Sequence, residues 1–197
     1  MTVPGTEPYP WPYDGPLDPQ RTALLICGAG VTWAIRTHLD PRVERALDDL
    51  RRVAADVGAL TVLIHHDAPH GRPATDLPER PAPKLTAHGH EHLVTAAGID
   101  GFYGSELDPL LHRHRRDQLL VVGRGLETTV HSTLRRANDR GYECLTVADA
   151  CAAVDPDLRA ASLSSICMSG GIFGAVGSVA ATISTLRAAA GADAPVS

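Results

Sequence analysis

Short apolar runs alternate with amphipathic stretches along the chain, and this alternation predicts an α/β fold. Each apolar run has the length of a strand and is bounded by polar residues, glycine or proline, as expected for strands buried in a parallel sheet. The predicted strands cover residues 22–28, 60–64, 93–94, 119–122, 144–147 and 172–176.

Five stretches between or after these strands carry helical signals. In residues 41–57 the apolar side chains recur at helical spacing. Asp40 is placed to cap this helix, Pro41 to begin it and Gly58 to end it. The other predicted helices begin at Ser105 and Asp155 or cover residues 128–140 and 177–190.

Strands that alternate with helices favour a parallel sheet covered on both faces. The predicted fold class is therefore α/β, a three-layer αβα sandwich with a central, mostly parallel six-stranded sheet of Rossmann-like type. Ligands of such sheets bind beyond the carboxyl ends of the strands. The segments that follow Cys27, Ile64, Val94 and Val122 are therefore the places to expect a site.

Residues 1–20 differ in composition from the rest of the chain. They are rich in proline and aromatic residues, which disfavours regular structure, so we expect an extended N-terminal arm packed on a surface. Residues 21–197 are long enough to bury one core and are expected to form a single domain.

Charge and composition narrow the classes of partner and location. The formal net charge of −5 argues against nucleic acid as a partner. No apolar run reaches about 18 residues, so no membrane partner is expected. No signal peptide is evident, so we expect a cytoplasmic location. The four cysteines show no metal-ligand spacing and are expected to be buried thiols.

Residues 130–144, VHSTLRRANDRGYEC, and residues 149–153, DACAA, resemble the isochorismatase-like superfamily of cysteine hydrolases. The nearest resemblance within it is to the biuret-hydrolase type of amidohydrolase. The resemblance implies an Asp at the end of the first strand, a Lys after the third strand and a Cys at the start of the helix after the fourth. It also implies that the thiolate attacks a carbonyl carbon while the Asp handles the proton.

The resemblance places other residues at all three catalytic positions. Gly28 stands where the Asp is expected, Ala96 where the Lys is expected and Thr129 where the Cys is expected. Because the flanking residues match at each point, we expect a replaced triad rather than a shifted alignment. Trp33 takes a position that usually holds Phe.

Three polar residues near these positions are the candidate catalytic residues. Thr129 lies at a helix N-terminus, which favours an anion, but a hydroxyl nucleophile needs a base beside it. Asp100 and Glu127 could each act as acid or base, or could equally be helix-end or surface carboxylates. His131 is expected on the opposite face of its helix from Thr129. Cys27 is expected to point to the opposite side of its strand from position 28. Structural roles are therefore expected for both.

Other residues around the predicted crevice are expected to contact a substrate. Arg124 and Gly125 correspond to the position of the cis peptide in the family, where backbone N–H groups bind an oxyanion. The candidate substrate-binding residues are Gly28, Trp33, Ala96, Phe102, Tyr103, Arg124 and Gly125.

Two histidine clusters suggest metal binding. They comprise His65, His66, Asp67 and His70, and His88, His90 and His92. The Asp-x-His motif of metal-binding nicotinamidase relatives is not reproduced, so we expect no metal and no other cofactor. Metal binding by the histidine-rich residues 65–92 stays open.

The replaced triad disfavours an amidohydrolase that uses cysteine. We expect recruitment to non-hydrolytic small-molecule chemistry, such as elimination, cyclisation or isomerisation in a biosynthetic pathway. A catalytically silent ligand-binding protein, or a partner of an active homologue, is the alternative, and amide hydrolysis by a threonine nucleophile is a third. The resemblance also implies a homo-oligomer, either a dimer or a tetramer.

Overall fold

A computed structural model describes residues 1–31, 40–67 and 85–192 of the chain. Its centre is one parallel six-stranded sheet with the strand order β3-β2-β1-β4-β5-β6. The strands are β1 (Thr22–Val31), β2 (Leu60–His66), β3 (His92–Ala96), β4 (Gln118–Arg124), β5 (Glu143–Ala152) and β6 (Ala175–Gly177).

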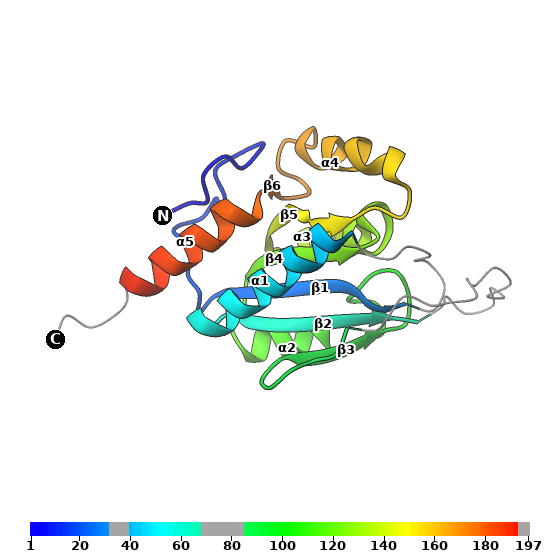
Figure 1. Cartoon of the computed structure of the whole chain (residues 1–197), viewed down its shortest axis with the longest axis horizontal. Coiled ribbons are helices and arrows are strands. Elements are labelled where there is room, and N and C mark those ends of the chain that lie inside the picture. The colour runs from blue at the N-terminus through cyan, green and yellow to red at the C-terminus, as the bar shows by residue number, and fades with distance from the viewer. Residues whose placement is uncertain (32–39, 68–84, 193–197) are drawn as a thin grey trace, which may run out of the picture.

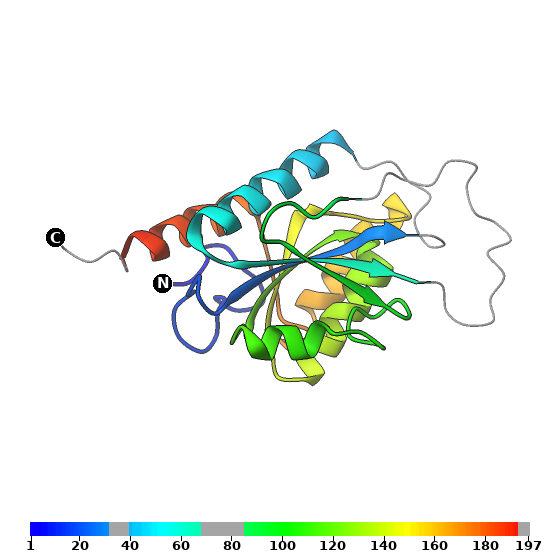
Figure 2. The same cartoon turned by 90° about the horizontal axis from the view of Figure 1, so that it is seen from below.

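Helices cover both faces of this sheet (Figure 1, Figure 2). The helices and helical turns are α1 (Pro41–Val57), α2 (Leu107–Arg113), η1 (Leu126–Val130), α3 (His131–Asp139), η2 (Pro156–Leu158), α4 (Arg159–Cys167) and α5 (Val179–Ala192). α1 packs with α5 on one face, and α2 and α3 lie on the opposite face. The predicted three-layer α/β sandwich is therefore confirmed, and its sheet is wholly parallel.

The helix predicted over residues 41–57 is confirmed with its capping residues. The carboxylate of Asp40 accepts a hydrogen bond of 2.8 Å from the backbone N–H of Arg42, and Gly58 ends the helix in a left-handed conformation. Its buried face consists of Leu47, Leu50, Val53 and Ala54. None of the helices in the described part of the chain combines the length and apolar character needed to span a bilayer.

The last predicted strand is displaced toward the C-terminus. Residues 172–174 form a turn rather than a strand, and Ile172 is 70% exposed. Gly171 and Gly174 flank this turn with positive φ angles of 102° and 78°, which a glycine adopts without strain. The prediction of strand at residues 172–174 is therefore wrong, because these residues turn between two glycines and Ile172 faces solvent, although Phe173 packs against the core.

The N-terminal segment packs against the sheet edge instead of extending into solvent. Glu7 and Val176 exchange two backbone hydrogen bonds of 3.0 and 2.7 Å, so the segment pairs with β6 in antiparallel fashion. Val3 donates a backbone hydrogen bond to the carbonyl of Trp11, whose side chain is fully buried. Figure 1 shows this segment beside β6 and α5.

Candidate functional site at the carboxyl edge of the sheet

The three positions predicted to have lost the triad lie where neighbouring strands end. Gly28 belongs to the irregular end of β1, where the pairing with β2 shifts register between Cys27 and Gly30. Ala96 is the buried last residue of β3, and Thr129 lies in η1 directly after β4. None of these side chains is ionisable near neutral pH. Trp33 lies outside the described residues.

The Thr129 hydroxyl is enclosed by the turn that precedes it. It donates a hydrogen bond to the carbonyl oxygen of Arg124 and lies 3.5 Å from the carbonyl oxygen of Gly125. The side chain has no solvent exposure. In this geometry the hydroxyl proton is held by a backbone acceptor, so the observed role of Thr129 is to close the turn between β4 and η1.

Gly125 forms that turn without a cis peptide. Its φ of 77° is left-handed, and a Cβ atom there would lie 2.5 Å from the Thr128 hydroxyl, so only glycine fits. Its N–H donates to the carbonyl of Ala152 at 2.8 Å, and its own carbonyl accepts from Thr128 and Val130. The bond between Arg124 and Gly125 is trans, so the cis peptide expected from the resemblance is not present.

Arg124 places a buried guanidinium at the end of β4. Only 2% of the residue is exposed, and burial lowers the pKa of the guanidinium, while the charge of Glu44 partly opposes this shift. A cation buried at the carboxyl edge of a parallel sheet is suited to bind an anionic group.

Asp100 organises the loop after β3. One carboxylate oxygen accepts a 2.9 Å hydrogen bond from the backbone N–H of Phe102, and the other lies 3.1 Å from the Nε of Arg136 on α3. Phe102 is buried, whereas Tyr103 is 57% exposed. Asp100 therefore ties its own loop to α3.

Glu127 likewise ties two segments together, in this case η1 and the segment after β5. Its two carboxylate oxygens accept backbone hydrogen bonds from Val154 at 3.0 Å and from Asp155 at 2.7 Å, in the segment after β5. Within the described residues, no hydrogen bond links Asp100, Glu127 and Thr129 to one another. Each candidate catalytic residue instead has its own structural partners.

His66 is a buried imidazole that the sequence reasoning left among the loop histidines. It ends β2 with 1% exposure, and its Nδ1 lies 2.9 Å from the carbonyl oxygen of Gly98, so Nδ1 carries the proton. Its Nε2 has no hydrogen-bond partner in the part of the chain that the structure describes, and burial lowers the pKa of the ring despite the Gly98 contact. The sequence alone did not show which of the neighbouring residues His65 and His66 would be buried, because that depends on how β2 pairs in the sheet.

The described residues contain no cluster of three or more His, Cys, Asp or Glu able to hold a metal ion. His70, from one of the two predicted clusters, lies outside the described residues. His88 donates its backbone N–H to Glu91 at 2.7 Å, and the rings of His92 and His114 lie 5.3 Å apart.

All four cysteines are far from a reactive state. Cys27, Cys144 and Cys151 are fully buried. Burial raises the pKa of Cys27 and of Cys151 to about 12 and raises the pKa of Cys144 as well. Cys167 ends α4, and burial raises the pKa of its thiol too. A thiolate nucleophile is therefore disfavoured at each cysteine.

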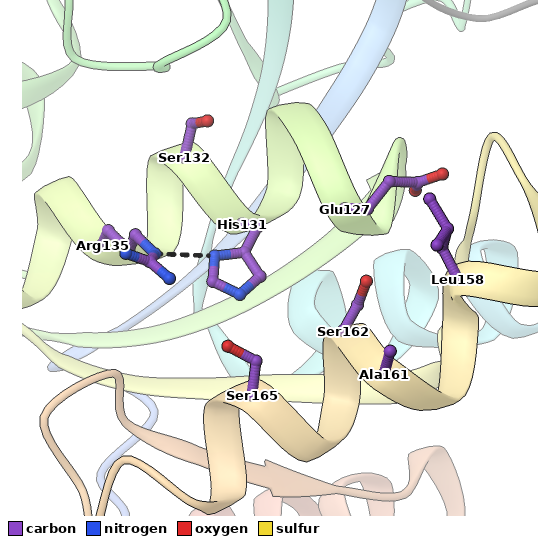
Figure 3. A pocket seen from close by; sticks show the side chains of 8 residues that line it. All are labelled: Glu127, His131, Ser132, Arg135, Leu158, Ala161, Ser162 and Ser165. Atoms are coloured by element: carbon purple, nitrogen blue, oxygen red, sulfur yellow. Dashed lines mark hydrogen bonds between the residues drawn. The ribbon is translucent and has the colours of Figure 1, made fainter.

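A groove of about 390 Å³ lies between the η1–α3 segment and α4. Figure 3 shows its lining side chains, with His131 and Arg135 on one wall and the α4 serines on the other. The lining residues, which define the α3–α4 groove, are Glu127, His131, Ser132, Arg135, Leu158, Ala161, Ser162 and Ser165.

Known proteins share both sequence and fold with this chain. Residues 22–181 match the family model of the Isochorismatase domain. The uncharacterized isochorismatase family protein YwoC of Bacillus subtilis (strain 168) is 26% identical over an alignment of 162 residues that covers 75% of this chain and 86% of YwoC.

Solved structures agree with this at the level of the fold. A cysteine hydrolase from Pseudomonas syringae pv. phaseolicola 1448A gives a TM-score of 0.70 at 19% identity, over 89% of this chain and 96% of that chain. The nicotinamidase SaPncA from Staphylococcus aureus gives a TM-score of 0.62 at 16% identity, over 80% and 98% of the two chains.

Proposed function

Because the chain belongs to the isochorismatase family but carries Thr129 after β4, we propose that it acts on a small molecule without cysteine-dependent hydrolysis. The observation that carries this proposal is the state of the four thiols, which are buried or lie at the end of α4, with raised pKa values. Hydrolysis of the kind named for the Pseudomonas protein needs a thiolate beside the substrate carbonyl.

The chemistry that we propose is elimination, cyclisation or isomerisation at the carboxyl edge of the sheet. The buried guanidinium of Arg124 supports this because it can orient an anionic group of the substrate. The Nε2 of His66, for which residues 1–31, 40–67 and 85–192 offer no hydrogen-bond partner, supports it because a neutral imidazole can accept a proton. Asp100, Glu127 and Thr129 stay candidates for the catalytic residues, with Gly28, Ala96, Phe102 and Tyr103 as candidate walls of the site.

A catalytically silent ligand-binding protein is the second candidate. The contacts of the two carboxylates favour it, because Asp100 and Glu127 already accept backbone hydrogen bonds and Asp100 also pairs with Arg136. Carboxylate oxygens that are already bound to the backbone are less accessible to a substrate.

The absence of cysteine chemistry is tested with a panel of amides and ureas. We expect no turnover above buffer, and no change after treatment with iodoacetamide. An amide hydrolysis that iodoacetamide abolishes would overturn the proposal.

The two candidates are separated by a ligand screen that scores thermal stabilisation, followed by mass spectrometry of each hit in ¹⁸O-labelled water. Non-hydrolytic catalysis converts the hit without incorporating the label. A silent binding protein returns the hit unchanged, and label in the product would indicate hydrolysis and contradict both candidates.

A further inference from the structure

The α3–α4 groove combines hydrogen-bond donors from both helices with an apolar surface. His131, Ser132 and Arg135 come from α3, and Leu158 and Ala161 lie on or next to α4. A volume of about 390 Å³ is in the range of small-molecule sites. The groove adjoins the carboxyl edge at Glu127, but its other polar groups are distinct, because Thr129 contacts the β4 turn while His131 faces α4 (Figure 3).

The protonation state of His131 follows from one contact. The Nε of Arg135 donates a hydrogen bond of 3.0 Å to the Nδ1 of His131, so Nδ1 carries the lone pair. The neutral ring then has its proton on Nε2. In Figure 3 that nitrogen points across the groove toward the hydroxyl groups of Ser162 and Ser165.

Arg135 is held in place by two contacts and forms no ion pair with another described residue. Its guanidinium carbon lies 4.1 Å from the centre of the Phe173 ring, and its Nε is committed to His131. Within the described residues, its two terminal nitrogens make no hydrogen bond. A guanidinium fixed at one end and open at the other has the geometry that binds a carboxylate with two parallel hydrogen bonds.

Glu127 lines the same groove and limits the charge of a ligand. Its oxygens accept backbone hydrogen bonds from Val154 and Asp155, which hold them at the end of the groove away from Arg135 (Figure 3). Its negative charge disfavours a ligand that carries an anion at both ends. Leu158 and Ala161 offer apolar surface for an uncharged body.

We propose that the α3–α4 groove is a second binding site, for a small organic carboxylate whose anionic group is held by Arg135 and His131. The serine hydroxyls on α4 complete the set of donors around that group. This site shares only Glu127 with the candidate residues of the carboxyl edge, and the ligand's carboxylate is held by Arg135 and His131, so failure of this proposal would leave the function proposed there untouched.

The test is a titration of the full chain with benzoate, followed by the imidazole signals of ¹⁵N-labelled histidine, with benzamide as the uncharged analogue. We expect benzoate to shift the His131 signals with a millimolar dissociation constant, and benzamide not to shift them. The Arg135→Gln variant should bind benzoate at least about tenfold more weakly, because a charged hydrogen bond is lost.

Arg136→Gln is the matched control, since Arg136 is the next residue on α3 but pairs with Asp100 outside the groove. It should bind benzoate like the unchanged chain, and thermal melts should show that both variants are folded. The proposal is overturned if benzamide shifts His131 equally or if Arg135→Gln binds benzoate as before. It is also overturned if no His131 signal moves by about 50 mM benzoate, as when a second copy of the chain covers the groove.

Discussion

At the scale of single residues, the partner of a side chain decides its role more than its chemical type does. Thr129 stands where the resemblance expects a nucleophile, yet its hydroxyl is buried and bound to the Arg124 carbonyl. Residue identity at positions 28, 96 and 129 could be read from the sequence. The hydrogen bond could not, because it depends on the left-handed turn at Gly125.

The Thr129→Val variant tests this structural role. Valine keeps the shape but removes the hydroxyl and leaves the buried Arg124 carbonyl without this donor, so we expect a loss of about 1–3 kcal/mol in unfolding free energy. Urea denaturation followed by circular dichroism measures it. Thr128→Val is the control, because its hydrogen bond to Gly125 is long, at 3.4 Å, and should cost less. Unchanged stability together with a complete loss of a measured turnover would instead identify Thr129 as a nucleophile.

At the scale of elements, apolar runs located the strands because strands buried on both faces need them. The same rule placed the last strand too early, since Ile172 is apolar but lies in an exposed turn between two glycines. It also began the helix after β4 at residue 128, whereas η1 begins at Leu126 as a wide π-helical turn that depends on Gly125 and on a carboxylate contact with a distant segment.

Glu127→Ala tests that contact between η1 and the segment after β5. Removal of the carboxylate leaves the N–H groups of Val154 and Asp155 without their acceptor, so we expect faster hydrogen exchange at both residues. We also expect a loss of about 1–3 kcal/mol in unfolding free energy. Glu106→Ala is the control, because Glu106 is exposed and its side chain makes no capping hydrogen bond. Equal exchange rates at Val154 and Asp155 in the two variants would show that the Glu127 carboxylate does not hold this segment.

At the scale of the whole molecule, buried histidines link stability to pH. Burial lowers the pKa of His66 below its ordinary value of 6.5, so the unfolded chain takes up a proton at a higher pH than the folded chain does. As pH falls below about 6.5, the unfolded state gains stability relative to the folded state, until the pH reaches the lowered pKa. His131 contributes in the same direction, because burial lowers its pKa too.

We therefore expect the unfolding free energy to decrease between about pH 7.5 and about pH 5.5, and His66→Asn to reduce that dependence. Asparagine keeps a donor for the Gly98 carbonyl but does not titrate. Urea denaturation at several pH values measures the slope. His90→Asn, at an exposed position, should leave the slope unchanged, and a slope equal in all three proteins would contradict the prediction.

The alternation of apolar runs with amphipathic stretches predicted much of the overall architecture. It predicted the candidate site only in part. Asp100 and Glu127 were identified as polar groups near the expected crevice. Their partners lie 36 and 27 residues away in sequence, and such contacts appear only once the chain is folded. The burial of His66 likewise depends on the loop after β3 that covers it.

The pairing of Glu7 with Val176 affects how this protein is made. Glu7 leaves the ribosome well before Val176 is translated, because 168 residues separate them, so its backbone has no partner during that interval. A nascent chain stalled before residue 175 lacks β6, so it presents the backbone N–H and carbonyl groups of Glu7 without the strand that binds them in the folded chain.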